Sequence, residues 1–270
     1  MVNLMIKLAR GAKLYQLFAK CLPVHLLSKC SIRLLLTAIA LQSWTISTHL
    51  SAATFSQIHE TNFIQGWKVL VDTRLLENEK ESTGVAFRLL TLQLKEIILV
   101  VPAPAVAQLR EVTLWFSPIY AGVTPRTEYH PNATWLREHG RDPAMVKGIE
   151  FTDIKNFESE SQRMPNFTLH ELAHAYQDQI LPGGFDNAEI KAAYEKAKGS
   201  GKYDKVQRRN AHGGYSMERA YALTNPMEYF AECTEAFFSR NDFYPFDRAE
   251  LKQLDPDMER LLAKLWGVKY

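Results

Sequence analysis

Apolar residues recur at two spacings in this chain, and together they predict both helices and strands. Apolar residues at every third or fourth position, which is typical of helices, occur in residues 67–76, 83–101 and 225–240. Three further helices are predicted: a short one at 105–109, a polar one at 188–198, and a last one at 256–266 that begins with a proline after Asp255. Alternation rich in β-forming residues predicts strands at 112–116 and 147–154. Prolines and a glycine between positions 118 and 131 predict a loop.

A seventh helix is predicted from Thr168 to about Ile180, where a proline and two glycines follow. Most positions of this helix are apolar, which indicates that it is buried. Three polar residues, His170, Glu171 and His174, interrupt the apolar pattern. The chemistry of the chain is expected to centre on them.

His170 and His174 lie on one face of this helix because they are four residues apart. They are therefore able to hold one metal ion, and Glu171, about 100° round the helix, can reach a water at that ion. Zinc peptidases use this arrangement, with two imidazole ligands and a glutamate as general base. The alternative, two unrelated histidines, would leave polar groups unpaired in an apolar helix, which is costly. We therefore predict a Zn²⁺ site.

The first 53 residues differ from the rest of the chain and predict a targeting segment. They contain six basic residues and no acidic ones, and their apolar run at 32–41 has the length of a signal-peptide core. That run is shorter than the roughly 20 apolar residues that span a membrane. Small residues at 51–53 offer a cleavage site. We expect export, secreted or periplasmic. An uncleaved membrane anchor and an organelle transit peptide are the alternatives, and membrane attachment requires that the segment is retained.

The remaining residues have the composition of a globular domain without a nucleic-acid surface. The 270 residues are 46% hydrophobic and 23% charged. Residues 54–270 carry 26 basic against 30 acidic side chains, which argues against a nucleic-acid partner. The cysteines are Cys21, Cys30 and Cys233. Removal of the leader would leave Cys233 alone, so no internal disulfide is expected, and Cys233 is interpreted as a small core residue.

Zinc in a hydrolase usually has three protein ligands and one open position, so a third ligand is required. The segment 225–240 offers Glu228, Glu232 and Glu235, and His212 is a further candidate in a glycine-rich loop. Glu228 and Glu232 share a helix face. Like charges there are unfavourable unless a cation lies beside them, and their apolar neighbours argue against an exposed acidic stripe.

Four other features are weaker candidates for a role at the site. His130 could line a substrate cleft or be an ordinary loop histidine. Asp178, four residues after His174, could hydrogen-bond a ligand histidine or be a surface acid. The strand at 147–154 could be a sheet edge on which an extended peptide pairs. The polar, partly basic stretch at 186–216 could act as a flap over the site.

Two motifs of this sequence resemble the gluzincin metallopeptidases, and most of all the catalytic domain of the anthrax lethal-factor type. They are His170-Glu171-x-x-His174 and Tyr221-x-x-Thr224-Asn225-x-x-Glu228-x-Phe230-Ala231-Glu232. The resemblance covers roughly residues 165–240. It implies Glu228 as third zinc ligand, Tyr221 as oxyanion donor and Glu232 as a supporting acid. Pro226-Met227 departs from the family pattern and leaves Glu232 as an alternative ligand, but the spacing from Tyr221 favours Glu228.

The resemblance implies an α+β, zincin-like fold. It would have a small mixed sheet, an edge strand beside the active-site helix and a mostly helical C-terminal part. Residues 54–270 would form one metallopeptidase domain with its metal site within 168–238. The expected function is hydrolysis of peptide bonds in a peptide or protein substrate, with a zinc-activated water and Glu171 as general base. The alternatives are an inactive binding protein on this scaffold and a zinc hydrolase of a non-peptide amide, such as a cell-wall component.

Overall fold

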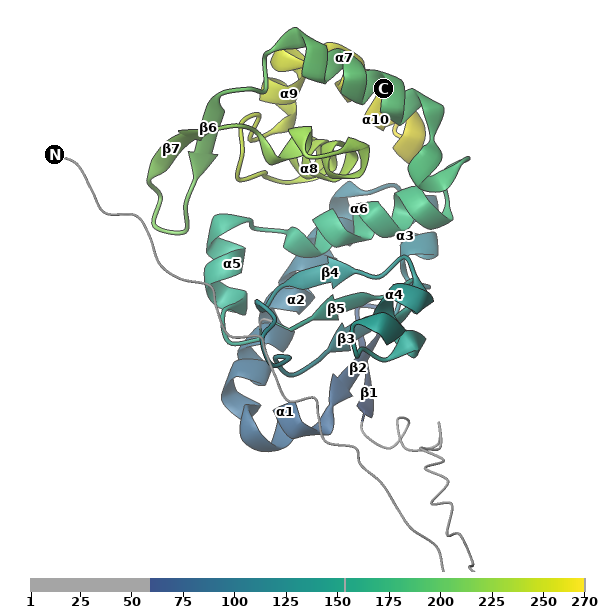
Figure 1. The fold of residues 1–270 in the computed structure, drawn as a ribbon, viewed down its shortest axis with the longest axis vertical. Coiled ribbons are helices and arrows are strands. Elements are labelled where there is room, and N and C mark those ends of the chain that lie inside the picture. Colours follow the sequence, from purple (N-terminus) through teal and green to yellow (C-terminus); the bar gives the residue numbers. More distant parts are fainter. Residues whose placement is uncertain (1–58, 153, 270) are drawn as a thin grey trace, which may run out of the picture. The chain divides into compact units, whose positions relative to one another are not determined.

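A five-stranded mixed sheet and a group of C-terminal helices lie on opposite sides of one central helix, α6 (Phe167–Gln179) (Figure 1). The computed structural model describes residues 59–152 and 154–269, so the predictions for residues 1–53 lie outside it. The order of the strands in the sheet is β1-β2-β3-β5-β4, with parallel pairs in the middle and antiparallel pairs at both sides. The strands are β1 (His59–Ile64), β2 (Trp67–Asp72), β3 (Leu114–Phe116), β4 (Thr127–Tyr129) and β5 (Ile149–Phe151).

Helices make up most of the described chain, and this confirms the predicted α+β class. Before α6 they are α1 (Thr73–Asn78), α2 (Lys80–Val100), α3 (Ala103–Leu109), α4 (Ala133–Glu138) and α5 (Phe157–Arg163). After it come α7 (Ala188–Ser200), α8 (Pro226–Phe238), α9 (Arg248–Leu254) and α10 (Pro256–Trp266). Three 3-10 turns are η2 (Pro143–Met145), η3 (Gly184–Asp186) and η4 (Tyr221–Leu223). Among the described helices, none has the length and apolar character needed to cross a membrane.

The helix predicted at 67–76 is wrong, because its first six residues form strand β2. Trp67, Val69 and Val71 alternate, and all three are fully buried on one face of the sheet. The preceding Gln65 and Gly66 have φ of 52° and 94° and make a two-residue turn that pairs β1 with β2. The apolar residues also fit a helical spacing, so only the turn distinguishes the two structures.

The main core lies between one face of this sheet and helices α2, α5 and α6. Leu114 and Phe116 of β3 face this core, and the intervening Trp115 packs in a second, smaller cluster on the opposite face. The same alternation in β5 directs Ile149 and Phe151 into the core and Glu150 to the other side. Helix α6 therefore lies against an apolar support.

The edge strand beside α6 is β4, and the prediction that the strand at 147–154 is the edge is wrong. That segment contains β5, which lies between β3 and β4 and is hydrogen-bonded on both sides. Residues 127–129 were expected to be loop, since three residues between prolines carry too short an alternation to recognise. Figure 1 shows β4 running next to α6.

The stretch expected to be a flap contains helix α7 and a hairpin of two strands, β6 (Val206–Arg209) and β7 (Tyr215–Glu218). The hairpin projects on the same side of the domain as α5 (Figure 1). It is tied to residues 242–244 by main-chain hydrogen bonds, from Arg209 N to Asp242 O at 2.7 Å and from Tyr244 N to Gln207 O at 2.8 Å. One side of β6 is thus held by the body of the domain.

Candidate metal centre and active site

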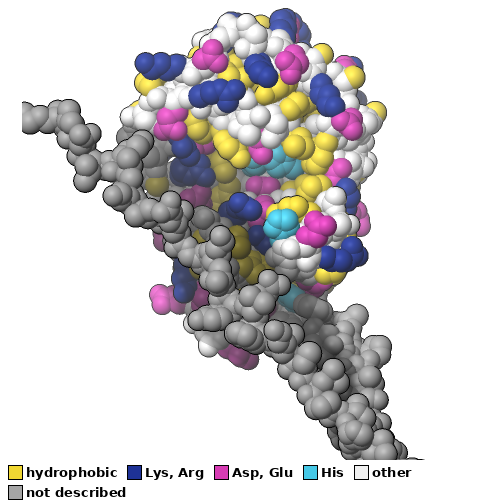
Figure 2. Space-filling model, in the orientation of Figure 1, with side chains coloured by type: hydrophobic (Ala, Val, Ile, Leu, Met, Phe, Trp, Pro, Cys, Tyr) yellow, Lys and Arg dark blue, Asp and Glu magenta, His cyan; other side chains and the backbone are white. Residues whose placement is uncertain are grey.

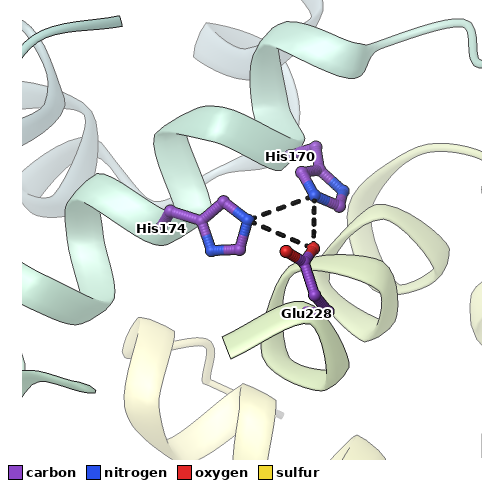
Figure 3. A group of neighbouring side chains, drawn as sticks. All are labelled: His170, His174 and Glu228. Carbon is purple, nitrogen blue, oxygen red and sulfur yellow. Dashed lines mark hydrogen bonds and ion pairs between the residues drawn. The ribbon is translucent and has the colours of Figure 1, made fainter. Parts of the chain in front are cut away.

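The side chains of His170, His174 and Glu228 meet at one point between α6 and α8 (Figure 3). Nε2 of His170 lies 3.2 Å from Nε2 of His174, and these nitrogens lie 3.1 Å and 3.4 Å from Oε2 of Glu228. Asn225 fixes the start of α8, because its side chain accepts hydrogen bonds from the main-chain N–H groups of Met227 and Glu228. Pro226, the departure from the family pattern, occupies the first position of this helix, where no N–H donor is needed.

The geometry and chemistry of these three donors fit a zinc ion. Tetrahedral ligands about 2.0–2.1 Å from zinc are separated by about 3.3–3.4 Å, close to the spacing of this triangle. Two imidazole nitrogens and one carboxylate oxygen are also the donor types of many catalytic zinc sites. The same three atoms without a cation would place two lone pairs and a negative charge together in a largely buried position.

The electrostatics of the triangle favour a positive charge at its centre. Burial raises the pKa of Glu228, but hydrogen bonds with His170 and His174 outweigh this and hold the pKa well below its usual range. Burial lowers the pKa of His170, but Glu235 and Glu228 outweigh it and raise this pKa well above normal. The site thus stabilises a cation, either protons on the imidazoles or a metal ion.

Glu235 orients His170, a role that the sequence interpretation assigned to Glu232. Oε1 of Glu235 accepts a hydrogen bond from Nδ1 of His170 at 2.6 Å. That bond leaves the Nε2 lone pair of His170 directed at His174 and Glu228. Oε1 of Glu232 is 3.8 Å from the same Nδ1, too far for a hydrogen bond, and its Oε2 accepts from Asn241 at 3.0 Å. Glu235 was recognisable in the sequence as the third acid on this face of α8.

Glu171 lies beside the triangle and is held by the edge strand. Its Oε2 accepts a hydrogen bond of 2.8 Å from the main-chain N–H of Tyr129 in β4. Burial raises the pKa of Glu171, and the neighbouring His170 and His174 lower it in part. A partly buried carboxylate next to a cation site is suited to accept a proton.

A cleft of about 460 Å³ extends from His170 and Glu171 along the N-terminal side of α6. Thr127 of β4 and Tyr221 of η4 line it as well, so the structure brings the predicted oxyanion donor to the same cleft. The Tyr221 side chain is 46% exposed. Figure 2 shows histidine and acidic side chains together in the recess between the sheet and the C-terminal helices.

His130 lies outside this cleft, so the prediction that it lines a substrate cleft is wrong. It is 1% exposed, and its Nε2 lies 2.9 Å from Oε2 of Glu150 on the far face of the sheet. Glu150 also stands directly opposite Glu128 in the β4–β5 pair, and Nη1 of Arg141 bridges the two carboxylates at 2.5 Å and 3.0 Å. Arg141 supplies the cation that this acidic group needs, so no metal is required there.

Asp178 also lies away from the ligand histidines. Its Oδ2 accepts hydrogen bonds from the hydroxyl of Tyr129 at 2.6 Å and from Nζ of Lys147 at 2.5 Å. Within the described part of the chain, Nδ1 of His174 is buried and has no hydrogen-bond partner. The predicted bond from Asp178 to a ligand histidine is therefore wrong, and Asp178 instead ties the end of α6 to the edge of the sheet.

Residues 149–264 match a protein-family model described as glucose-regulated metallo-peptidase M90. The matched stretch is less than half of the chain, runs from β5 into α10 and contains all three members of the triangle together with Glu171 and Tyr221. At the level of the family, this match supports a metal-dependent peptidase. It does not bear on the narrower gluzincin and lethal-factor resemblance, which stays a prediction. No curated protein and no solved structure matches the chain.

Proposed function

We propose that this protein is a zinc-dependent hydrolase that cleaves peptide bonds. The observation that carries the proposal is the triangle of His170, His174 and Glu228, whose separations of 3.1–3.4 Å suit one zinc ion. The adjacent Glu171 carboxylate and the cleft that begins at this point support it, and so does the family match over residues 149–264.

Each residue of the site has a separate role in this proposal. The two histidines and Glu228 hold the ion. Zinc bound there would lower the pKa of a water and polarise the scissile carbonyl. Glu171 accepts the proton of the attacking water and passes it to the leaving amine. The hydroxyl of Tyr221 donates a hydrogen bond to the oxygen that becomes negative as the tetrahedral carbon forms.

The edge of β4 offers a means of holding an extended substrate. Arg126 O accepts a hydrogen bond from Thr152 N, and His130 N donates one to Gly148 O, so both groups are directed towards β5. Because these directions alternate along a strand, the main-chain groups of Thr127 and Tyr129 point away from β5. Tyr129 N is bonded to Glu171, while Thr127 lines the cleft. We propose that a peptide pairs with β4 here, beside the zinc ligands.

The proposal is tested by comparing wild-type protein with Glu171→Gln. Metal analysis should find one zinc per chain in both proteins. Cleavage of an unfolded protein should fall roughly 10²–10⁴-fold in the variant and disappear when a chelator removes zinc from the wild type. Absence of zinc, or full activity of Glu171→Gln, would refute it. Bound zinc without cleavage of any peptide would favour a binding protein or a hydrolase of another amide.

For the N-terminal region, we propose that residues 1–53 direct export and that 54–270 form the catalytic domain. The support is the basic, acid-free composition of this segment and its short apolar core. Sequencing the N-terminus of protein recovered from cells tests this: a mature start near Ala53 is expected. An intact leader in the membrane fraction would indicate an anchor instead.

A further inference from the structure

The position of Tyr221 depends on the main chain that carries it. Its side chain is half exposed, and no hydrogen bond joins its hydroxyl to another described residue. On its C-terminal side, η4 leads into the capped start of α8. On its N-terminal side, β7 ends at Glu218, only three residues earlier. The intervening Ala220 donates from its main-chain N–H to Tyr203 O at 2.9 Å, so this bond and the β6–β7 hairpin together restrain the N-terminal side of the tyrosine.

A chain of ion pairs connects this hairpin to the opposite wall of the cleft. Arg163, the last residue of α5, donates from Nη1 to Oδ2 of Asp242 at 2.6 Å. The same oxygen accepts from Nε of Arg208 in β6 at 3.1 Å. Arg208 continues through Nη1 to Oε2 of Glu218 at 3.1 Å, at the end of β7. Arg163, Asp242 and Arg208 all line the cleft that contains Tyr221.

Asp242 is the central member of this chain because it alone is fully buried. It is 1% exposed, whereas the side chains of Arg163 and Arg208 are 24% and 35% exposed. A buried carboxylate shared by two guanidinium groups loses several favourable contacts if either cation moves away. Its main-chain oxygen also accepts from Arg209 N of β6. Both the side chain and the backbone of Asp242 therefore hold the hairpin.

We propose that Asp242 is a positioning residue that holds Tyr221 at the metal centre through Arg208, Glu218 and the hairpin. The inference rests on the proposed function, because it assumes that Tyr221 stabilises the transition state. A displacement of about 1 Å in a group that contacts the reacting atoms can reduce turnover roughly a hundredfold. Asp242 touches neither the zinc ligands nor Glu171, so its loss should leave zinc binding intact.

A double-mutant cycle on kcat tests the coupling. Tyr221→Phe should lower kcat about 10²–10³-fold. Asp242→Asn should lower kcat roughly tenfold or more, with KM within about twofold and zinc content unchanged. In the Tyr221→Phe background, Asp242→Asn should have no further effect, because the hydroxyl that it positions is already absent. If kcat of the double variant falls by the product of the two single-variant factors, the inference is overturned.

Two further variants keep the test decisive if Asp242→Asn does not fold. Glu218→Gln removes the last, half-exposed link of the chain, and it should reproduce the non-additive loss of kcat more weakly. Glu189→Gln is the matched control, because it breaks an exposed ion pair with Lys264 far from the cleft, and it should leave kcat unchanged. Equal activities of Glu218→Gln and Glu189→Gln would overturn the inference. Wild-type activity in Tyr221→Phe would instead refute the proposed role of Tyr221.

Discussion

Nδ1 of His170 and Oε1 of Glu235 are 2.6 Å apart and buried, so the imidazole of this histidine has one fixed orientation. Glu235 lies seven residues after Glu228, two turns along α8. One face of α8 thus provides both Glu228, the third member of the triangle, and Glu235, the hydrogen-bond partner that orients His170. The position of α8 against α6 therefore determines the geometry of the whole centre.

Replacement of Glu235 should weaken metal binding more than replacement of Glu232. Glu235→Gln removes the charge that orients His170, and loss of such a partner typically costs 10–100-fold in metal affinity. Glu232→Gln, on the same helix and equally buried, should change the affinity by less than about threefold, because its nearest oxygen is 3.8 Å from Nδ1. Competition with a chromophoric chelator measures both. A larger loss in Glu232→Gln would show that Glu232 is the orienting acid.

Removal of the metal should destabilise the fold as well as stop turnover, because the ligands come from two helices. Zinc at about a hundred times its Kd should raise the free energy of unfolding by about 2.7 kcal/mol relative to the apo protein. Thermal unfolding with and without chelator measures this change. Glu228→Ala should unfold at the same temperature in both conditions, since two histidines alone would hold zinc weakly. A full zinc-dependent shift in Glu228→Ala would contradict the triangle.

The cap of α8 should affect zinc affinity through Glu228. Asn225→Ala removes the acceptor for two N–H groups of the first turn and should cost about 1 kcal/mol of stability. It should also weaken zinc binding. Asn187→Ala is the matched control, because Asn187 caps α7 in the same way, with bonds to Glu189 N and Ile190 N. Equal zinc affinities in the two variants would show that the cap does not position Glu228.

Acid should destabilise the protein through Glu150. Burial raises the pKa of this carboxyl, but hydrogen bonds from His130 and Tyr120 outweigh it and lower the pKa to about 2. A lowered folded-state pKa stabilises the protein above the usual glutamate pKa of about 4.3, and this stability is lost as the pH falls towards 2. The shift corresponds to roughly 3 kcal/mol.

Urea unfolding between pH 6 and pH 3 checks this pH dependence. In Glu150→Gln, the fall in the free energy of unfolding over this range should be smaller than in the wild type by a large part of that amount. The exposed Glu189→Gln should keep the wild-type slope. Parallel curves for Glu150→Gln and the wild type would exclude Glu150 as a source of acid sensitivity.

The local parts of the site were predictable from the sequence, and the parts set by packing between elements were not. His170, Glu171 and His174 lie within one turn of a helix, so their spacing alone predicts their common face. Glu228 and Glu235 lie on one stripe of α8. Which of these acids contacts which imidazole nitrogen depends on how α8 packs against α6. No local sequence pattern predicts that packing.

The errors in the predicted fold have similar causes. The apolar residues of 67–72 fit both the helical and the strand spacing, and a strand was recognisable only from the Gln65-Gly66 turn. Strand β4 has three residues, too few for an alternating pattern to stand out. His130 was a candidate because it is a loop histidine and Asp178 because it follows His174 by four residues, whereas their actual partners, Glu150 and Lys147, come from other segments of the chain.

The shortness of β4 has a consequence for the choice of substrate. An edge strand of three residues can pair with only a short, fully extended length of polypeptide. Helices and internal strands have already used their main-chain hydrogen bonds, so they cannot dock on it. An enzyme that binds its substrate along this edge strand would first require an extended, unpaired main chain. The amino-acid sequence of the substrate would matter only after that requirement is met. Loops, frayed termini and misfolded chains would be cut, while residues held in helices or internal strands would escape.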